Sequence, residues 1–159
     1  MSSSHNFSPE EQAYLSKAQL FCDRQEQCPS TVMNKLRSWG ASQEVAERII
    51  DSLVADDWLN PQRYCRLYAQ SKLHQQKWGR IKIAYHLRSR QLDSALIKQA
   101  LDSIDPEQYL QTLHALAGSK QASIHDSDPY RRRMKLASFL ASHGFTQEEI
   151  ASELNDLEL

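Results

Sequence analysis

The sequence contains little glycine, little proline and no long apolar run. Its 159 residues include only 4 Gly and 5 Pro, which is little material for the turns of an all-β fold. No apolar stretch approaches the roughly 20 residues that span a bilayer. The first residues, MSSSHNFSPEE, lack the basic and apolar regions of a secretory signal. We therefore expect a helical protein of the cytoplasm with no membrane association.

The residue patterns that support catalysis or metal binding are also missing. The cysteines are odd in number and have no C-x-x-C spacing, which argues against a disulfide framework or a zinc site: Cys22, Cys28 and Cys65. No two histidines are spaced as in a zinc protease, and the glycines are too scattered for a phosphate-binding loop. His125 beside Asp126 and Asp128 is typical of a polar loop. The sequence predicts no enzyme, no metal and no cofactor.

An internal repeat of about fifty residues runs through the chain. Residues 36–53 align without gaps to residues 87–104 at an offset of 51, and these align to residues 140–157 at an offset of 53. Apolar residues in each copy recur near the helical period, and such a repeat is typical of arrayed helical units. The sequence therefore predicts an all-α fold of three tandem three-helix repeats in an elongated array, over residues 9–57, 58–105 and 106–159.

Corresponding positions in the three copies have similar chemistry. Each copy has a leucine at its first aligned position and a helix-capping side chain six residues later: Leu36, Leu87, Leu140, and Ser42, Asp93, Thr146. The turn between them has Gly40 and Gly144 in the outer copies but Gln91 in the middle copy, so we expect a different turn there. The third repeat is the least regular, because residues 118–129 are predicted to form a polar loop.

Positive charge is concentrated in the middle of a nearly neutral chain. The net charge is −1, yet residues 61–100 carry nine basic and one acidic side chain, net +8. Residues 1–60, 101–125 and 126–159 carry net charges of −4, −2 and −3. A solvated surface is the simpler interpretation. However, exposed helices ordinarily mix both signs at i,i+4 spacing, so we favour a basic face that binds an anionic partner.

The basic face is predicted on two helices, one over residues 61–76 and one that begins after Gly79. The helical period places Ile83, Ala84 and Leu87 on the buried side of the second helix. The candidate contacts are the basic side chains Arg63, Arg66, Lys72, Lys77, Arg80, Lys82 and Arg88. We expect the tryptophans, with Tyr64 and Tyr68, to pack between helices and not to stack on bases.

A second basic cluster is predicted at the start of a helix that follows Asp128-Pro129. It consists of Arg131, Arg132 and Arg133. Positive charge near a helix N-terminus is opposed by the helix dipole, a placement that an anionic partner would relieve. These arginines are therefore a second candidate contact.

The middle of the sequence resembles the central repeat of the RecX regulatory proteins, which modulate the recombinase RecA. That repeat has a Leu-Asn/Asp-Asp segment, Arg-Phe-Ala, a Tyr, Gly-Pro and a basic stretch that ends in Ile-x-x-x-Leu. The matching residues are Leu59-Asn60, Arg63-Tyr64, Tyr68, Gly79, Ile83 and Leu87, with Ile97 and Leu101 beyond. The sequence departs from the family at Pro61, Cys65, Arg80 and Gln91, where Asp, Ala, Pro and Gly are usual.

The resemblance implies a non-enzymatic regulator in homologous recombination, DNA repair and the SOS response. It would bind the filament of RecA on single-stranded DNA and inhibit recombinase activity, and we expect it to act as a monomer. One alternative is a helix-turn-helix regulator that reads duplex DNA in the major groove. The distribution of basic residues along two helices favours backbone contact over base reading. An enzyme acting on nucleic acid is a weaker alternative, because no acidic or metal-binding cluster is present.

Overall fold

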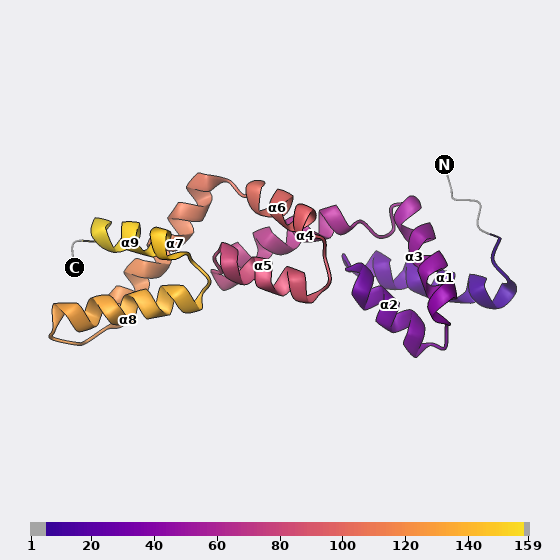
Figure 1. Ribbon diagram of the computed structural model, residues 1–159, viewed down its shortest axis with the longest axis horizontal. Helices are drawn as coiled ribbons and strands as arrows, with labels where there is room; N and C mark the ends of the chain where they lie inside the picture. Colours follow the sequence, from indigo (N-terminus) through magenta and orange to yellow (C-terminus); the bar gives the residue numbers. More distant parts are fainter. Residues whose placement is uncertain (1–5, 158–159) are drawn as a thin grey trace. The chain divides into compact units, whose positions relative to one another are not determined.

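The computed structural model describes residues 6–157, and within this range it is helical and contains no strand (Figure 1). The elements in chain order are α1 (Pro9–Arg24), α2 (Pro29–Ser38), α3 (Gln43–Ala55), α4 (Pro61–Ser71), a π-helical turn η1 (Lys72–Gln76), α5 (Arg80–Ser89), α6 (Ser94–Asp102), α7 (Pro106–Ser123), α8 (Pro129–Ser142) and α9 (Gln147–Asp156). The all-helical prediction is confirmed. Of the helices in the described part of the chain, none is long and apolar enough to cross a membrane.

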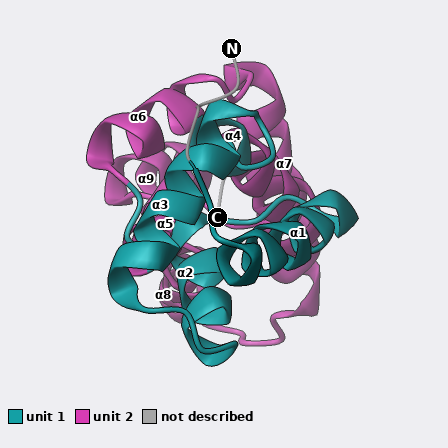
Figure 2. Ribbon diagram, turned by 90° about the vertical axis from the view of Figure 1, so that its right-hand side faces the viewer, with its two compact units in different colours: residues 1–65, 90–92 teal, residues 66–89, 93–159 magenta. Residues whose placement is uncertain are grey.

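The chain divides into two compact units (Figure 2). One contains residues 1–65 with 90–92, and the other contains residues 66–89 with 93–159. Helices α7, α8 and α9 contact one another, α5 contacts α6, and α7 also contacts η1, all within the second unit. The boundaries 9–57, 58–105 and 106–159 remain a prediction of the sequence repeat.

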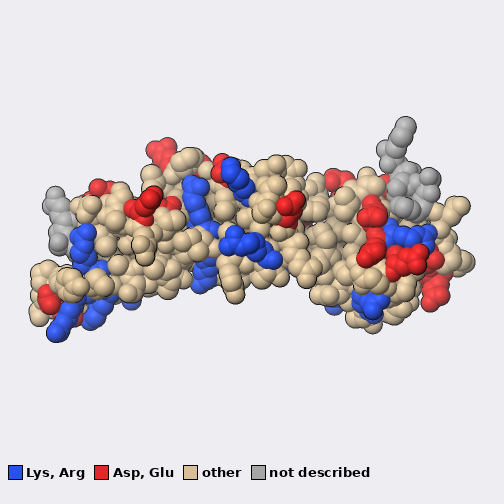
Figure 3. Space-filling model, viewed as in Figure 1, with Lys and Arg blue, Asp and Glu red and all other residues tan. Residues whose placement is uncertain are grey.

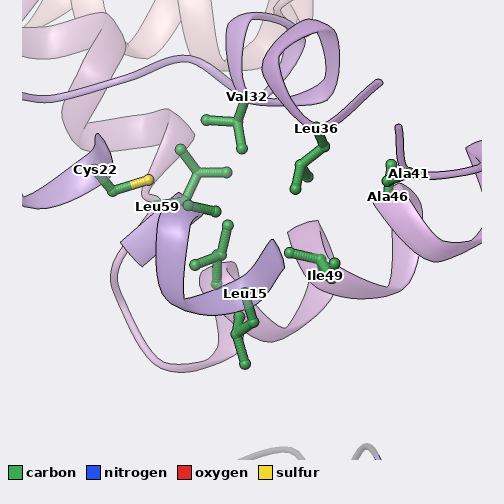
Figure 4. Packing of buried hydrophobic residues seen from close by; sticks show 10 residues of the cluster. Leu15, Cys22, Val32, Leu36, Ala41, Ala46, Ile49 and Leu59 are labelled. Carbon is green, nitrogen blue, oxygen red and sulfur yellow. The ribbon is translucent and has the colours of Figure 1, made fainter. Parts of the chain in front are cut away.

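The first unit has its core among α1, α2 and α3 (Figure 4). Successive turns of these helices, with one residue from each of the two connections that follow α2 and α3, contribute the buried cluster of Leu15, Ala18, Cys22, Val32, Leu36, Ala41, Ala46, Ile49, Leu53 and Leu59. In α3 the buried residues recur three or four positions apart, which is the spacing of one helix face. The side chain of Ser8 caps α1 by accepting the Glu11 N–H at 3.2 Å, and Ser42 caps α3 by accepting the Val45 N–H.

The repeat predicted from the sequence has the same local structure in each copy. Leu36, Leu87 and Leu140 are all fully buried. The three predicted capping residues Ser42, Asp93 and Thr146 each accept a backbone N–H at the start of a helix. Thr146 also forms a capping box, because its own N–H donates to Glu149 at 2.8 Å.

The turn of the middle copy is not different in conformation, contrary to the expectation from its glutamine. Gln91 has φ 63°, in the same left-handed region as Gly40 at 107° and Gly144 at 95°. Glutamine is uncommon there because its Cβ crowds the backbone, so the middle copy tolerates strain that glycine avoids at the other two turns. The surrounding packing therefore decides this turn more strongly than the local residue preference does.

The predicted polar loop over residues 118–129 is wrong in its first half. Helix α7 continues through Gly118 to Ser123, and the connection to α8 consists of residues 124–128. Ala117 is fully buried just before this segment, and Gln121 is half-buried within it. Packing of this face extends the helix beyond the point where its polar residues favoured a loop.

A close backbone crossing joins the start of α5 to the turn between α8 and α9 within the second unit. The Gly79 N–H donates to His143 O at 2.7 Å, and the Ile81 N–H donates to Gly144 O at 2.9 Å. The N–H groups at the start of α5 and the carbonyl groups at the end of α8 have no partner inside their own helices. These two hydrogen bonds pair them with each other. A Cβ atom on Gly79 would lie 2.6 Å from the Gly144 backbone. The crossing therefore requires glycine.

Candidate functional site

The predicted basic face is built on α4, η1 and α5, and its first helix differs from the prediction. The α-helix ends at Ser71 and continues as the wider π-helical turn to Gln76. Lys77 then adopts a left-handed conformation, with φ 60° and ψ 40°. Cys65, Ala69 and Leu73 are the fully buried side chains of this segment. The left-handed conformation of Lys77 ends the π-helical turn. Trp78 and Gly79 then connect it to α5.

Trp78 is the centre of a cluster of aromatic and cationic side chains within the second unit. The ammonium groups of Lys72 and Lys82 lie 5.1 and 4.9 Å from the centre of its ring, within the range of a cation–π interaction. The imidazole of His86 stacks on Trp78 with ring centres 4.6 Å apart. Tyr85 then meets His86 edge to face at 5.5 Å. The structure thus brings together Lys72 and Lys82 of the predicted contacts.

Two of the predicted contact residues form ion pairs within the protein. Arg63 pairs with Glu26, and it also pairs with Asp57 at 3.1 Å. The hydrogen bond from its guanidinium to Glu26 raises the pKa of Arg63.

Arg80 lies 3.8 Å from a Glu149 oxygen and covers the ring of Tyr109 at 4.7 Å. Burial raises the pKa of that tyrosine, and the Glu149 charge raises it further. Arg63 and Arg80 therefore have structural roles that the sequence did not reveal.

The remaining predicted contacts are exposed. Arg66, Lys77 and Arg88 project from α4, the end of η1 and α5. Lys77 donates to the His74 carbonyl at 2.6 Å. No ion pair within residues 6–157 includes Arg66 or Arg88. Residues 61–92 include no acidic side chain, and acids from elsewhere in residues 6–157 pair with Arg63 and Arg80 but not with Arg66 or Arg88. On the face drawn in Figure 3, Lys and Arg side chains gather over α5.

The arginine cluster of α8 has partners inside the protein. Arg131 lies 3.7 Å from Asp128, Arg132 donates to the Asp126 carbonyl at 2.9 Å, and Arg133 donates to Asn155 at 3.1 Å. Asp128 also caps α8 by accepting the Tyr130 N–H. These contacts offset the unfavourable position of the arginines at the helix N-terminus, which gives them a structural role beside the predicted binding role.

No group of three or more His, Cys, Asp or Glu side chains among residues 6–157 could hold a metal ion. All three cysteines are buried and free of disulfides. Burial raises the pKa of the Cys65 thiol to about 11, which disfavours its thiolate, whereas at Cys28 the effect of burial is outweighed by hydrogen bonds with Ser30 and Thr31, which lower the pKa of that thiol. The basic face itself offers electrostatic attraction from its lysines and arginines together with aromatic contact from Trp78 and Tyr85.

Tyr85 and Ile81 are surface features that the interpretation of the sequence did not single out as contacts. Tyr85 is 62% exposed and Ile81 is 53% exposed, both on α5. The available signal was the helical period. With Ile83, Ala84 and Leu87 buried, a spacing of about 100° per residue directs Ile81 and Tyr85 toward solvent.

Two family patterns match the second half of the chain. The pattern described as "RecX, second three-helix domain" matches residues 61–101. The pattern described as "RecX, third three-helix domain" matches residues 107–152. The first of these ranges contains α4, η1, α5 and nearly all of α6, and the second contains nearly all of α7, then α8 and most of α9.

Similar proteins carry the same family name. A "Regulatory protein RecX" of Clostridium acetobutylicum is 27% identical over 155 residues, which cover 93% of this chain and 72% of the relative. One of Clostridium tetani is 30% identical over 139 residues, covering 86% of this chain and 63% of that relative. The chain thus spans less than two thirds of the length of the second relative.

A solved structure shows the same fold. The crystal structure of RecX from Lactobacillus salivarius superposes with a TM-score of 0.86 at 22% identity, and covers 96% of this chain and 99% of its own.

Proposed function

Because the chain belongs to the RecX family of regulatory proteins, we propose that it binds the RecA filament on single-stranded DNA. It acts there without catalysis and inhibits recombinase activity. The observation that carries the proposal is the unbalanced charge of α4, η1 and α5. Residues 61–92 carry eight basic and no acidic side chains. Such a surface attracts a polyanion such as a DNA backbone, and an acidic protein surface would be attracted in the same way.

The accessible members of the face define its contact region. Arg66, Lys77 and Arg88 are exposed on α4, just after η1 and on α5, while Lys72 and Lys82 are half-buried beside Trp78. Arg63 and Arg80 contribute positive potential, but their ion pairs with Glu26 and Glu149 hold them in place. We expect direct contact from the first group and a mainly structural contribution from Arg63 and Arg80.

The crossing at Gly79 supports filament binding over the helix-turn-helix alternative for this part of the chain. A recognition helix reads base edges with the residues at its N-terminus. Here the N-terminus of α5 is covered, because the Gly79 and Ile81 N–H groups donate to the turn between α8 and α9. The side chains of α5 remain accessible along its length, which suits contact with a backbone or a protein surface.

The direct test of the proposal is hydrolysis of ATP by RecA on single-stranded DNA, with and without this protein. We expect the rate to fall as the protein is added, and the effect to weaken steeply as salt is raised. An unchanged rate at low salt, with the protein shown to be folded by circular dichroism, would contradict the proposal. Added duplex DNA should relieve the inhibition no more than added single-stranded DNA does. A protein that reads the major groove would instead be drawn away by the duplex.

A second contact is proposed at the arginine cluster of α8. Replacing Arg131, Arg132 and Arg133 together by Ala should weaken inhibition of ATP hydrolysis at low salt. Because these arginines have partners inside the protein, the melting temperature of the variant must be compared with that of the unaltered chain. Full inhibition by a folded variant would limit the contact region to α4, η1 and α5.

A further inference from the structure

We propose that Tyr85 is a stacking site for an unpaired base of single-stranded DNA. The inference rests on the proposed function, and it identifies single-stranded DNA as a ligand of the basic face. Tyr85 lies on α5 with 62% of its surface exposed. A large aromatic ring is usually withdrawn from water in a folded protein. An exposed ring on a cationic surface is the arrangement with which proteins bind single strands, because every base has a face that can stack.

The positions of the neighbours on α5 support this assignment. At about 100° per residue, Lys82 and Arg88 lie about 60° to either side of Tyr85 on the helix surface. Ile81 lies one turn before it, 53% exposed, and extends the apolar surface. An aromatic ring between two cations matches the chemistry of a nucleotide, in which an uncharged base is joined to negatively charged phosphates.

The ring of Tyr85 contacts a second aromatic side chain, which in turn contacts a third. Tyr85 meets His86 edge to face at 5.5 Å, and His86 stacks on Trp78 at 4.6 Å with an angle of 23° between the planes. The ammonium groups of Lys72 and Lys82 lie close to the Trp78 ring. A surface whose side chains are already ordered loses less conformational entropy when it binds a ligand.

Tyr130 serves as a control that tests whether exposure of a tyrosine ring is sufficient for base stacking. It is 69% exposed on α8 in the same compact unit. Its N–H is bound by Asp128, and the nearby cations are paired: Lys135 with Asp126 at 3.1 Å and Arg131 with Asp128. These carboxylates offset part of the positive charge beside Tyr130. Of these two exposed tyrosines, Tyr85 is the one flanked by cations, Lys82 and Arg88, that form no ion pair among residues 6–157.

The test compares two fluorescein-labelled oligodeoxynucleotides by anisotropy, with the full chain and without RecA. One is an oligothymidylate and the other has abasic sites throughout, with the same number of phosphates. We expect the unaltered protein to bind the oligothymidylate more tightly. Tyr85→Ala should weaken that binding about tenfold or more, within the range for loss of one stacked base. It should leave binding of the abasic probe and the salt dependence unchanged.

Two further variants separate stacking from other effects. Tyr85→Phe keeps the ring and should bind both probes as the unaltered protein does. Tyr130→Ala should also bind both probes unchanged. Equal affinity of the unaltered protein for the two probes, or unchanged binding by Tyr85→Ala, would overturn the inference.

The outcome is distinguishable from that of the proposed function, which is measured separately as inhibition of RecA. If Tyr85→Ala weakens inhibition of RecA but the unaltered protein binds the two free probes equally, Tyr85 contacts protein and the base-stacking inference is overturned. Discrimination between the probes without any inhibition of RecA would uphold the stacking site and contradict the filament function.

Discussion

Leu36, Leu87 and Leu140 occupy the same position in three successive copies of the repeat, and none of these side chains reaches solvent. Each lies near the end of a helix that is followed by a left-handed residue, at Gly40, Gln91 and Gly144. A leucine at this position buries its apolar surface. At the residue scale the fold therefore depends on a small set of positions that recur with the repeat.

Leu87→Ala tests the importance of this position in the basic repeat. The substitution leaves a cavity beneath α5, and we expect it to lower the free energy of unfolding by about 2–5 kcal/mol. Leu67→Ala is a matched control, because Leu67 is 43% exposed on α4 and its loss should change stability by only about 0.5 kcal/mol. Urea denaturation measures both. Equal effects of the two substitutions would contradict the assigned burial.

The charged residues show what sequence reasoning could not supply at this scale. The excess of basic residues over 61–92 was evident from the composition, and the helical period predicted the burial of Ile83 and Leu87. However, the partner of Arg63 is Glu26, 37 positions away, and that of Arg80 is Glu149. Such pairs depend on tertiary packing, which neither local spacing nor composition encodes.

At the scale of elements, the second unit is joined by the crossing of α5 with the turn between α8 and α9. A Cβ on Gly79 would lie 2.6 Å from the Gly144 backbone, and one on Gly144 would collide with Lys82. Gly144 also has φ +95°, which side chains rarely adopt. The sequence predicted Gly144 as a helix-ending residue and Gly79 as a motif position. Their meeting could not be predicted, because it brings together residues 65 positions apart.

Glycine substitutions should separate this crossing from ordinary helix effects. Gly79→Ala and Gly144→Ala should each lower the free energy of unfolding by about 1–3 kcal/mol or more, because backbone atoms must move. Gly118→Ala is the control: nothing lies within 4 Å of its added Cβ within α7, and alanine should stabilise the helix by about 0.5–1 kcal/mol. A stabilising effect at Gly79 would contradict the close approach.

The connection between α7 and α8 should give stability that depends on pH. The Asp128 N–H at 3.0 Å and the Lys135 ammonium at 3.1 Å lower the pKa of Asp126. Its pKa in the folded state is therefore below the value of about 3.9 expected when unfolded. The contribution is fully present above about pH 4 and is lost as the pH falls through the folded-state pKa.

Asp126→Asn should therefore have a lower melting temperature than the unaltered chain at pH 7. The difference should shrink as the pH is lowered below about 4, where the unaltered carboxylate takes up a proton. Lys135→Gln removes the other partner and should reproduce part of the loss at pH 7. A difference between Asp126→Asn and the unaltered chain that stays constant from pH 7 to pH 2 would rule out the ionised carboxylate as its source.

At the scale of the whole molecule, the main feature is the separation of charge along the sequence. A net charge of −1 conceals +8 over residues 61–100. Both the fold class and this charge pattern could be predicted from the sequence, because periodicity and composition are local properties. The exposure of Tyr85 follows from the same helical period, but the stacking of His86 on Trp78 beside it could not be predicted, because it depends on how α5 follows the π-helical turn.

The central claim is that positive charge on α5 holds the protein against the RecA filament. The most direct measurement is filament affinity of the double variant Lys82→Glu, Arg88→Glu at low salt. Its matched control is Arg24→Glu, Arg37→Glu, which makes the same change in net charge at exposed positions of α1 and α2. The melting temperatures of both variants establish that they are folded.

The α5 variant should lose affinity at least several-fold, while the control should bind as the unaltered protein does. If both basic residues contact phosphates of a single strand, the plot of log affinity against log salt should become flatter by about 1.4. An α5 variant that melts normally and binds the filament with undiminished affinity would contradict the account.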